Sequence, residues 1–228
     1  MVDKPAGLET VVTGGGNTRF CLRSILRRRL SLPQLEPAHR LDRDTTGCVL
    51  FAKTADYAEA LQDLFRGRKA RKEYLAVCLS VPRPPAGTIR QPLSRWTGGK
   101  QPVRVLRGKG LDAQTDYHTL ASASVRSLPQ GGASLVLFRP LTGRTHQIRV
   151  HAAAIGCPIL GDDQYGDRAA NRQARQAFGL DRQALHAWTI EFKDPRSGKV
   201  LHVRAPVPED MQAAIDLWLP RARAAMAR

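Results

Sequence analysis

Apolar side chains recur at helical spacing in two segments near the start of the chain. Residues 17–30 combine apolar positions with arginines on the opposite side, which predicts a basic amphipathic helix. Residues 54–67 carry an apolar stripe between Thr54, a capping residue type, and Gly67, which predicts a second helix. The apolar residues are Phe20, Ile25 and Leu26 in the first segment and Tyr57, Ala58, Leu61, Leu64 and Phe65 in the second.

Further along the chain, shorter apolar or alternating runs predict strands. These runs are 48–51, 73–79, 103–106, 115–122 and 134–138. Alternating residues on both sides of a DPRSGK turn predict a hairpin over 188–204. Because strands fill the centre without a regular strand–helix–strand rhythm, we predict an α+β fold with a mostly antiparallel mixed sheet flanked by helices.

Two helices are predicted in the second half of the chain. The first begins with Thr145 as its cap and ends at Gly156, and the second follows Pro208. Arg144 and Arg149 lie in or next to the first turn of the earlier helix, where the helix dipole disfavours a cation. Their placement indicates an anion nearby, either a phosphate or a carboxylate.

The composition is that of a folded protein. The chain has 228 residues, of which 42% are hydrophobic, and we expect residues 1–228 to form a single domain. No apolar run approaches the roughly 18 residues of a membrane span, and the first residues lack the layout of a signal peptide, so we expect a cytoplasmic location without membrane attachment. The four cysteines lie far apart with no CxxC pair, which predicts neither a zinc knuckle nor a disulfide framework.

Positive charge exceeds negative charge by 16, from 36 Lys and Arg against 20 Asp and Glu. An arginine-rich proteome would also give an excess, but the charge is clustered here, which favours a nucleic acid partner. With 6% aromatic residues, a platform that stacks many successive bases is not expected. The clusters are Arg27, Arg28 and Arg29, then Arg66, Arg68, Lys69, Arg71 and Lys72, and then Arg104, Arg107 and Lys109.

Several common cofactor and catalytic motifs do not occur in the sequence. The glycine-rich segments 14–16 and 98–100 fit neither a dinucleotide-binding fingerprint nor a P-loop. His146 and His151 are five residues apart with no acid between them, which does not fit a zincin pair, and there is no GxSxG elbow. We therefore expect no metal and no cofactor.

A charged loop directly before a predicted buried strand is the first candidate site. Asp42 and Asp44 lie there among His39, Arg40 and Arg43, where a carboxylate would lose its solvation unless it were paired. A surface loop with solvated ion pairs is the alternative interpretation. One hypothesis joins this loop to the later helix start: an aspartate of the loop pairs with an arginine of the helix.

Four motifs of the chain resemble those of the RluA-type pseudouridine synthases, and they follow one another along the sequence in the same order as in that family. Residues 39–47, HRLDRDTTG, resemble the HRLDxxTSG signature of that family. Residues 143–151, GRTHQIRVH, followed by 156–162, GCPILGD, resemble its GRTHQIRVH…GHPILGD segment. Residues 3–7, DKPAG, and 72–76, KEYLA, resemble its opening motif and its K-x-Y-x-A strand.

The sequence also departs from the family pattern. Thr46 stands where Ser is usual, and Cys157 stands where His is usual. The family's chain reaches the position of Asp3 through a longer strand, so we expect a shortened first strand: either the start is misplaced or the edge of the sheet is altered. Nothing resembles the S4-type RNA-binding module of many members, so the resemblance implies a single catalytic domain over 1–228 that contacts RNA itself.

The resemblance implies that the protein isomerises uridine in RNA to pseudouridine. The N1–C1′ bond breaks and the uracil rejoins the sugar through C5, without metal, redox cofactor or ATP. Asp42 is implied to be the nucleophile, acting at C1′ or at the base, with Arg149 as the cation that keeps it ionised. Tyr74 is implied to stack on the uracil, with a core tyrosine as the alternative, and Arg40 to fill the gap left by the extruded nucleotide.

Other residues are expected to support this site. Arg144 and His146 line the same pocket, or else pack or contact phosphate, and Asp44 orients the loop through Thr45 or Arg43. The charged clusters supply most of the affinity for RNA. The resemblance leaves open which ribosomal or transfer RNA stem-loop is modified.

Two other classes of protein compete with this interpretation. A catalytically silent RNA-binding protein would explain the charge but has no use for Asp42 beside Arg149. A sugar hydrolase would use two carboxylates, but Asp42 and Asp44 are two residues apart in one loop and such residues rarely flank a substrate. We therefore predict an RNA pseudouridine synthase that acts as a monomer.

Overall fold

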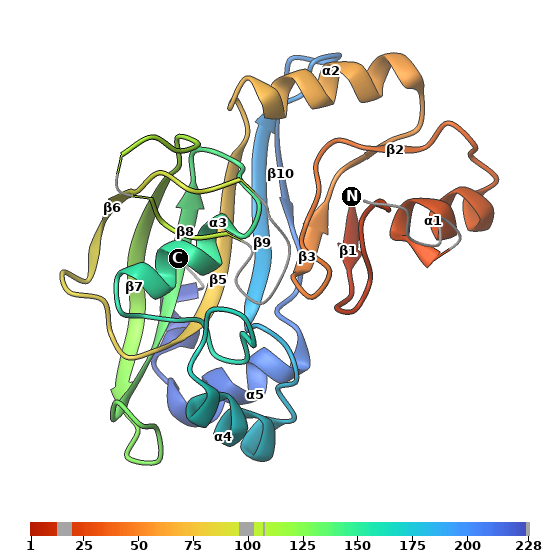
Figure 1. Cartoon of the computed structure of the whole chain (residues 1–228). Helices are drawn as coiled ribbons and strands as arrows, with labels where there is room; N and C mark the ends of the chain where they lie inside the picture. The colour runs from red at the N-terminus through yellow and green to blue at the C-terminus, as the bar shows by residue number, and fades with distance from the viewer. Residues whose placement is uncertain (13–19, 96–102, 107, 227–228) are drawn as a thin grey trace. The chain divides into compact units, whose positions relative to one another are not determined.

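The computed structural model describes residues 1–12, 20–95, 103–106 and 108–226, and the chain forms two compact units (Figure 1). The first unit joins Met1–Lys72 to Ala187–Pro206, and the second joins Glu73–His186 to Val207–Arg228. Each unit is built from two separate stretches of chain. Because the chain passes from one unit to the other and back, the two units do not decide whether it has one domain or two. A single catalytic domain over 1–228 therefore stays a prediction.

The first unit contains a sheet in which β3 (Thr46–Val49) lies between β1 (Val2–Lys4) and β9 (Leu185–Lys193). β1 is short, as expected, and runs antiparallel to β3. The hairpin predicted near the end of the chain is confirmed, because β9 and β10 (Val200–Arg204) pair antiparallel. A separate antiparallel pair consists of β2 (Glu36–Pro37) and β4 (Phe51–Ala52).

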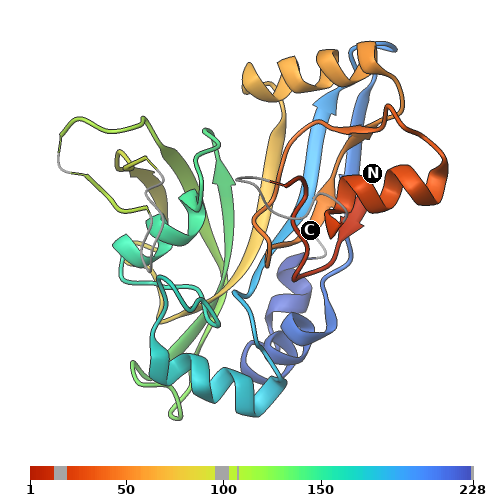
Figure 2. The ribbon, with the colours of Figure 1, turned by 45° about the vertical axis from the view of Figure 1, so that its right-hand side comes forward.

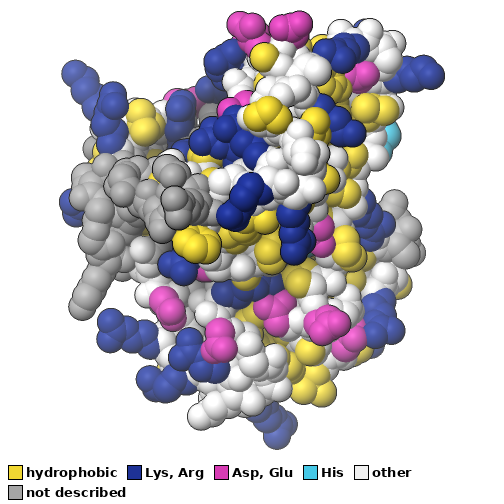
Figure 3. Space-filling model, turned by 90° about the vertical axis from the view of Figure 1, so that its right-hand side faces the viewer, with side chains coloured by type: hydrophobic (Ala, Val, Ile, Leu, Met, Phe, Trp, Pro, Cys, Tyr) yellow, Lys and Arg dark blue, Asp and Glu magenta, His cyan; other side chains and the backbone are white. Residues whose placement is uncertain are grey.

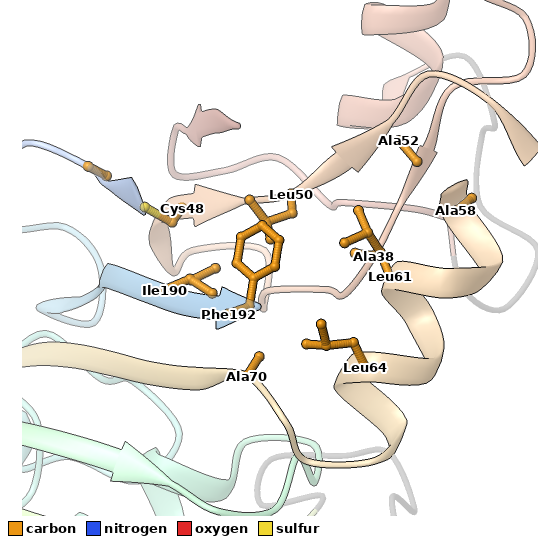
Figure 4. Packing of buried hydrophobic residues seen from close by; sticks show 11 residues of the cluster. Ala38, Cys48, Leu50, Ala52, Ala58, Leu61, Leu64, Ala70, Ile190 and Phe192 are labelled. Atoms are coloured by element: carbon orange, nitrogen blue, oxygen red, sulfur yellow. The ribbon is translucent and has the colours of Figure 1, made fainter. Parts of the chain in front are cut away.

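Helix α2 (Ala55–Arg66) confirms the second predicted helix and closes the core of the first unit. Its residues Ala58, Leu61 and Leu64 are buried and point toward side chains of β3, β4 and β9 (Figure 4). Each fully buried leucine contributes about 1.5–3 kcal/mol relative to an exposed one. The strand-side members of this cluster include Cys48, Leu50, Ala52, Ile190 and Phe192.

Helix α1 (Leu22–Leu30) covers the later part of the predicted segment 17–30, of which residues 17–19 lie outside the described residues. Phe20 lies before the helix and is 68% exposed, so it is not part of the buried side as predicted. At α2, Thr54 occupies the N-cap position as predicted, but its hydroxyl accepts from Nη2 of Arg196 (2.9 Å) rather than capping the helix. This contact and the bond from Tyr57 to Asp194 (2.6 Å) place α2 beside the turn that joins β9 and β10 (Figure 2).

In its described residues, the second unit contains four antiparallel strands. The order of its strands is β5, β8, β7 and β6. The pairs β5–β8, β7–β8 and β6–β7 are all antiparallel, which agrees with the predicted α+β fold and mostly antiparallel sheet. The bounds are Arg71–Leu79 for β5, Ala86–Arg90 for β6, Gln114–Ser124 for β7 and Gly132–Pro140 for β8.

The second unit differs from the prediction in two helices and one strand. Helix α3 (Gln147–Ala154) follows His146, which is the N-cap residue with a left-handed φ of 56°, so the prediction of Thr145 as the cap is wrong. The predicted strand over 103–106 is reduced to an isolated bridge between Val105 and Leu93. The remaining helices are α4 (Arg168–Phe178), which was not predicted, α5 (Glu209–Trp218), which was, and α6 (Ala222–Met226).

The described helices are also informative about membranes. None of them has both the length and the apolar composition needed to cross a bilayer.

Candidate active site

Asp42 lies in a tight turn of the first unit, shortly before β3. The N–H of Thr45 donates to the carbonyl of Asp42 (3.2 Å), which closes the turn, and the Asp42 side chain is half-buried. Thr45 and Thr46 are both buried. The chain therefore passes from a partly accessible carboxylate directly into the core, which gives the turn a rigid base.

A buried lysine fixes the residue that follows Asp42. Lys4 is fully buried, and its Nζ donates to the carbonyls of Pro5 (2.8 Å), Leu8 (2.7 Å) and Arg43 (2.8 Å). These acceptors match the three N–H bonds of an ammonium group, which is costly to bury without partners. Nε of Arg43 in turn donates to the carbonyl of Gly7 (3.2 Å). Hydrogen bonds from and to residues 3–7, DKPAG, thus hold the main chain and the side chain of Arg43.

Thr10 and Gly7 hold the residues on either side of Asp42. The Thr10 hydroxyl accepts from the N–H of Leu41 (3.1 Å) and lies 3.3 Å from the Leu41 carbonyl, to which it donates. The N–H of Gly7 donates to Oδ1 of Asp44 (3.2 Å). Asp44 therefore orients the loop through Gly7, a partner that the sequence analysis did not name.

Only glycine fits at the C-terminal end of the turn, at position 47. Gly47 has a φ of 110°, and a Cβ at this position would lie 2.2 Å from the carbonyl oxygen of Ala187. The N-terminal end of the turn is fixed through Leu41 and its C-terminal end through Gly47. The Asp42 carboxylate is consequently carried by a main chain that has little freedom to move.

His39 stacks on Phe65 at 4.4 Å between ring centroids and accepts the N–H of Leu50 at Nε2 (3.2 Å). Burial, assisted by the positive charge of Lys72, lowers the pKa of His39 to about 3. A neutral ring is also what the Leu50 bond requires, because a protonated Nε2 has no lone pair to accept with. The neighbouring Arg40 side chain is exposed.

The basic residues expected to bind RNA near this loop lie at the end of α2 and the start of β5. Arg66, Arg68, Lys69 and Arg71 are exposed, and Arg66 pairs with Asp63 in the previous turn. Lys72 is half-buried, and burial together with Arg68 lowers its pKa. Figure 3 shows Lys and Arg side chains at many separate positions on one face, several of them beside acidic side chains.

In the other two predicted basic clusters, only some of the side chains are exposed and without an acidic partner close by in the chain's described contacts. Arg27 donates through Nη2 to Glu36 (2.6 Å), which also pairs with Arg23, whereas Arg28 and Arg29 are exposed. In the third cluster, Arg104 and Lys109 are exposed and Arg107 lies outside the described residues. Three further exposed arginines, Arg168, Arg172 and Arg175 of α4, lie at spacings of four and three residues on one side of the helix, and Arg175 pairs with Asp181.

In the second unit, Arg149 is held by a carboxylate that follows later in the chain. Nε of Arg149 donates to Oδ2 of Asp162 (2.7 Å), and Nη2 donates to Oδ1 of Asp162 (2.8 Å) and to Oε1 of Gln164 (2.9 Å). Both members of this pair are buried, with 6% and 1% of their side chains exposed. The anion that the sequence analysis expected beside this helix therefore includes Asp162.

Tyr165 lies between Arg149 and His146. The Arg149 guanidinium lies over the Tyr165 ring, 5.0 Å from its centroid. The Tyr165 hydroxyl is 2.9 Å from Nδ1 of His146 and accepts the N–H of Val103 (3.3 Å). Asp162 joins the same group, because its Oδ1 accepts the N–H of Tyr165 (3.1 Å).

Gln147 and His151, from the same motif, form a buried hydrogen-bond chain. Nε2 of Gln147 donates to Oγ1 of Thr115 (2.9 Å), which lies 2.8 Å from Nδ1 of His151. The other ring nitrogen faces the carbonyl of Gln91 (3.0 Å), which can only accept, so Nε2 carries the proton and Nδ1 accepts from Thr115. Burial lowers the pKa of His151, in agreement with a neutral ring.

Arg144 and Tyr74 complete the set of predicted residues in the second unit. Arg144 is half-buried and donates through Nε to the carbonyl of Asp112 (2.9 Å). Tyr74 lies on β5 opposite Phe138 of β8 and is half-buried. Its neighbour Glu73 accepts from Nε of Arg139 (2.8 Å). The stacking of Tyr74 on a uracil stays a prediction.

The predicted site residues thus fall into two groups. Asp42 and Arg40 share one loop of the first unit, and His146 and Arg149 share one cluster of the second. The pairing of Asp42 with Arg149 joins residues of different units and stays a prediction.

Comparison with known protein families shows to which family the chain belongs. The family described as RNA pseudouridylate synthase matches residues 1–154. The chain belongs to the RNA pseudouridylate synthase family. The matched span includes Lys4, Asp42, Tyr74 and Arg149, whereas Asp162 and Tyr165 lie beyond it, and the resemblance to RluA-type synthases is confirmed.

Named relatives support the same assignment. The chain is 35% identical to ribosomal large subunit pseudouridine synthase C of Escherichia coli (strain K12), over 94% of the chain and 66% of that protein. It is 37% identical to synthase D of Nitrosomonas europaea, over 94% of the chain and 61% of that protein. The chain thus spans less than two thirds of the length of these relatives. Human RNA Pseudouridylate Synthase Domain Containing 4 superposes with a TM-score of 0.70 at 26% identity, covering 97% of this chain and 88% of that one.

The two departures from the family pattern are both buried. Thr46 is 5% exposed and begins β3, where threonine keeps the hydroxyl of the usual serine. Cys157 is fully buried, and burial raises the pKa of its thiol to about 12, so it remains a neutral, packed side chain. Neither substitution places a new charge in the pseudouridylate synthase fold.

Sequence reasoning missed several residues that hold the candidate site residues of this family member in place. Asp162 belongs to the GCPILGD segment, and a carboxylate within a recognised motif, near arginines that need an anion, was a signal for the Arg149 pair. Lys4 also lies in a recognised motif. Thr10 and Tyr165 carried no comparable signal, because their contacts depend on the tertiary fold.

Proposed function

We propose that this chain is an RNA pseudouridine synthase that converts a uridine of large-subunit ribosomal RNA to pseudouridine. The observation that carries the proposal is the turn of Asp42, which is tied to Lys4, Gly7 and Thr10 while its carboxylate stays partly accessible. A reactive carboxylate must be positioned to within about 0.5 Å to act efficiently, and anchors on both sides supply that precision. The choice of ribosomal RNA follows the names of the relatives.

The reaction is an isomerisation that neither adds nor removes atoms overall. Asp42 attacks C1′ of the sugar or the uracil base, and the C1′–N1 bond breaks. The detached uracil turns so that C5 faces the sugar, a C1′–C5 bond forms, and the bond between Asp42 and the sugar or base breaks, which restores the free carboxylate. The proton of C5 is then lost to solvent and N1 takes up a proton. Because no electrons are transferred and no group is consumed, the proposal needs neither a metal nor an organic cofactor.

Other residues receive roles around this step. Arg149 is proposed to favour the ionised form of Asp42, since a cation within about 4–6 Å lowers a carboxyl pKa. Tyr74 is proposed to stack on the flipped uracil, and Arg40 to fill the gap that the nucleotide leaves in the stem-loop. The exposed side chain of Arg40, on the Asp42 loop itself, is suited to that role.

Affinity for RNA is proposed to come from exposed basic side chains. The predicted set near the Asp42 loop is Arg66, Arg68, Lys69, Arg71 and Lys72, and Arg144 and His146 are proposed to contact RNA from the second unit. The α4 arginines extend this set. Phosphate contacts of this kind release counterions, so binding should weaken steeply as salt is added. We propose that the enzyme acts as a monomer.

Tritium release from ribosomal RNA labelled at uracil C5 tests the proposal. The wild type should release tritium and form pseudouridine, whereas Asp42→Asn should lower turnover by more than about 1,000-fold while RNA binding is kept. Asp44→Asn is the matched control: it makes the same change two residues away and keeps an oxygen that accepts from Gly7, so turnover should stay within about threefold of wild type.

Other outcomes distinguish the competing classes. Binding without any release by the wild type would indicate a silent RNA-binding protein, and release of free uracil would indicate a glycosidic hydrolase. Turnover on transfer RNA but not on ribosomal RNA would keep the reaction and change the substrate. Unreduced turnover by Asp42→Asn would remove Asp42 from the nucleophile role.

A further inference from the structure

Tyr165 touches both functional side chains of the second unit through different parts of its side chain. Its ring lies under the Arg149 guanidinium, and its hydroxyl is hydrogen-bonded to His146. The two rings of Tyr165 and His146 meet edge to face, with centroids 5.6 Å apart. One tyrosine therefore defines the positions of an arginine and a histidine that the family motif places three residues apart.

The Tyr165 ring is itself fixed by the surrounding structure. It packs against a core cluster that includes Leu93, Val103 and Val150, all buried. Its hydroxyl accepts the N–H of Val103 (3.3 Å), and its own N–H donates to Asp162 (3.1 Å). A side chain held at its ring, hydroxyl and main chain can serve as a rigid support for its neighbours.

The Arg149 guanidinium is bounded on two sides by this arrangement. The bidentate contact with Asp162 holds one edge of the group, and the Tyr165 ring covers one of its faces and so limits tilting about that edge. A cation over an aromatic face gains about 0.5–2 kcal/mol, depending on its exposure to water. Loss of the ring would leave the Asp162 pair intact but allow the guanidinium to tilt.

We propose that Tyr165 is a positioning residue for the isomerisation, holding Arg149 through its ring and His146 through its hydroxyl. The inference rests on the proposed function, because it assigns a purpose to the geometry of those two side chains. Tyr165 does not act on the reacting atoms in this account. A displacement of about 1 Å at a catalytic group lowers turnover by roughly 100-fold, which sets the scale of the expected effect.

Two substitutions separate the two contacts. Tyr165→Phe keeps the ring under Arg149 and removes only the hydroxyl, so kcat should fall about three- to tenfold. Tyr165→Leu removes both contacts, so kcat should fall by about 30- to 100-fold. KM for RNA should stay within about twofold in both variants, because His146 is only one of many side chains proposed to supply affinity for RNA. Partial retention of kcat by the phenylalanine variant is the rescue that positioning through the ring requires.

Tyr57 provides a closely matched control. It also has an arginine over its ring, Arg196 at 4.6 Å, and its hydroxyl is also hydrogen-bonded to a side chain, in this case donating to Asp194 (2.6 Å). Tyr57→Phe therefore makes the same chemical change at a second tyrosine–arginine contact. Its kcat and KM should equal those of the wild type, measured well below the unfolding temperature of every variant.

Nuclear magnetic resonance gives a readout that does not depend on activity. The ring resonances of His146 should shift in Tyr165→Phe, and the Nε–H resonance of Arg149 should shift in Tyr165→Leu, with neither shift in Tyr57→Phe. Unchanged resonances, or a Tyr165→Leu variant with wild-type kcat, would overturn the positioning role. A wild type that releases no tritium would instead overturn the proposed function, and the resonances would still decide whether Tyr165 positions its neighbours.

Discussion

Asp42 and Arg149, to which we assign the same reaction, are held in different ways. The Asp42 turn is held through its main chain: Lys4 binds the carbonyl of Arg43, and Thr10 binds both polar groups of Leu41. Arg149 is instead held through its own side chain, by Asp162 and Gln164. In the first case the residue is left half-buried; in the second the guanidinium is buried and paired with a carboxylate.

The difference predicts which substitutions harm folding and which harm only chemistry. A carboxylate on a main-chain-anchored turn can be replaced without leaving a buried charge behind. A buried ion pair behaves differently, because removal of one partner leaves the other charge uncompensated. We therefore expect substitutions at the anchors of the Asp42 turn, and at either member of the Arg149 pair, to reduce stability, while Asp42 itself tolerates substitution.

The largest effect is expected at Asp162. Asp162→Asn leaves the Arg149 charge buried without its counterion and should lower the free energy of unfolding by about 3–5 kcal/mol. Urea-induced unfolding measures the loss. Asp181→Asn is the control, because the Arg175–Asp181 pair is exposed and its loss should cost at most about 1 kcal/mol. Equal losses at the two sites would show that Arg149 is not held by its buried partner.

A smaller loss is expected at Lys4. Lys4→Met keeps an unbranched side chain of similar length but leaves three carbonyl oxygens without their donor, so the free energy of unfolding should fall by about 2–3 kcal/mol. Turnover should fall as well, because the carbonyl of Arg43 is released beside Asp42. The same substitution at the exposed Lys53 should stay within about 0.5 kcal/mol of wild type. Reduced stability with full turnover would separate the lysine from the positioning of the turn.

The success of sequence reasoning differs between elements of the fold in a physically understandable way. Helix α2 was predicted because several apolar side chains face one core, so the helical period is written into the sequence. Helix α4 was missed because it buries only Ala170, Asn171 and Ala174, two of them small and one polar. Its charged exposed side resembles a loop when hydrophobic spacing alone is considered.

The same contrast applies to the candidate site. The need of Arg149 for an anion was visible, because a cation near a helix start violates a local rule. The anchors of the Asp42 turn were not visible in this way, because a bond from Thr10 to the main chain of Leu41 imposes no pattern on the sequence. Thr145 was chosen as a helix cap on residue type, but His146 occupies that position with a left-handed backbone.

The smallest of the expected effects on stability concerns His39, the neutral neighbour of the Asp42 turn. Its folded pKa of about 3 lies below the ordinary value of 6.5, so between these values the unfolded chain binds a proton that the folded chain does not. The stabilising contribution is complete above pH 6.5 and is lost as the pH falls toward 3. Between pH 7 and pH 5 the free energy of unfolding should drop by about 1–2 kcal/mol from this residue.

The pH dependence of the free energy of unfolding must be separated into the contribution of His39 and that of His151 in the second unit. His151, also buried and neutral, contributes in the same direction, so the wild-type slope contains both residues. His39→Gln offers an oxygen that accepts from Leu50 but does not titrate in this range, and it should remove only the His39 share of the slope. Urea-induced unfolding at pH 7, 6 and 5 measures the difference. An unchanged slope in this variant would mean that the folded chain does not lower the pKa of His39, and the bond from Leu50 would then not require a neutral ring held by burial.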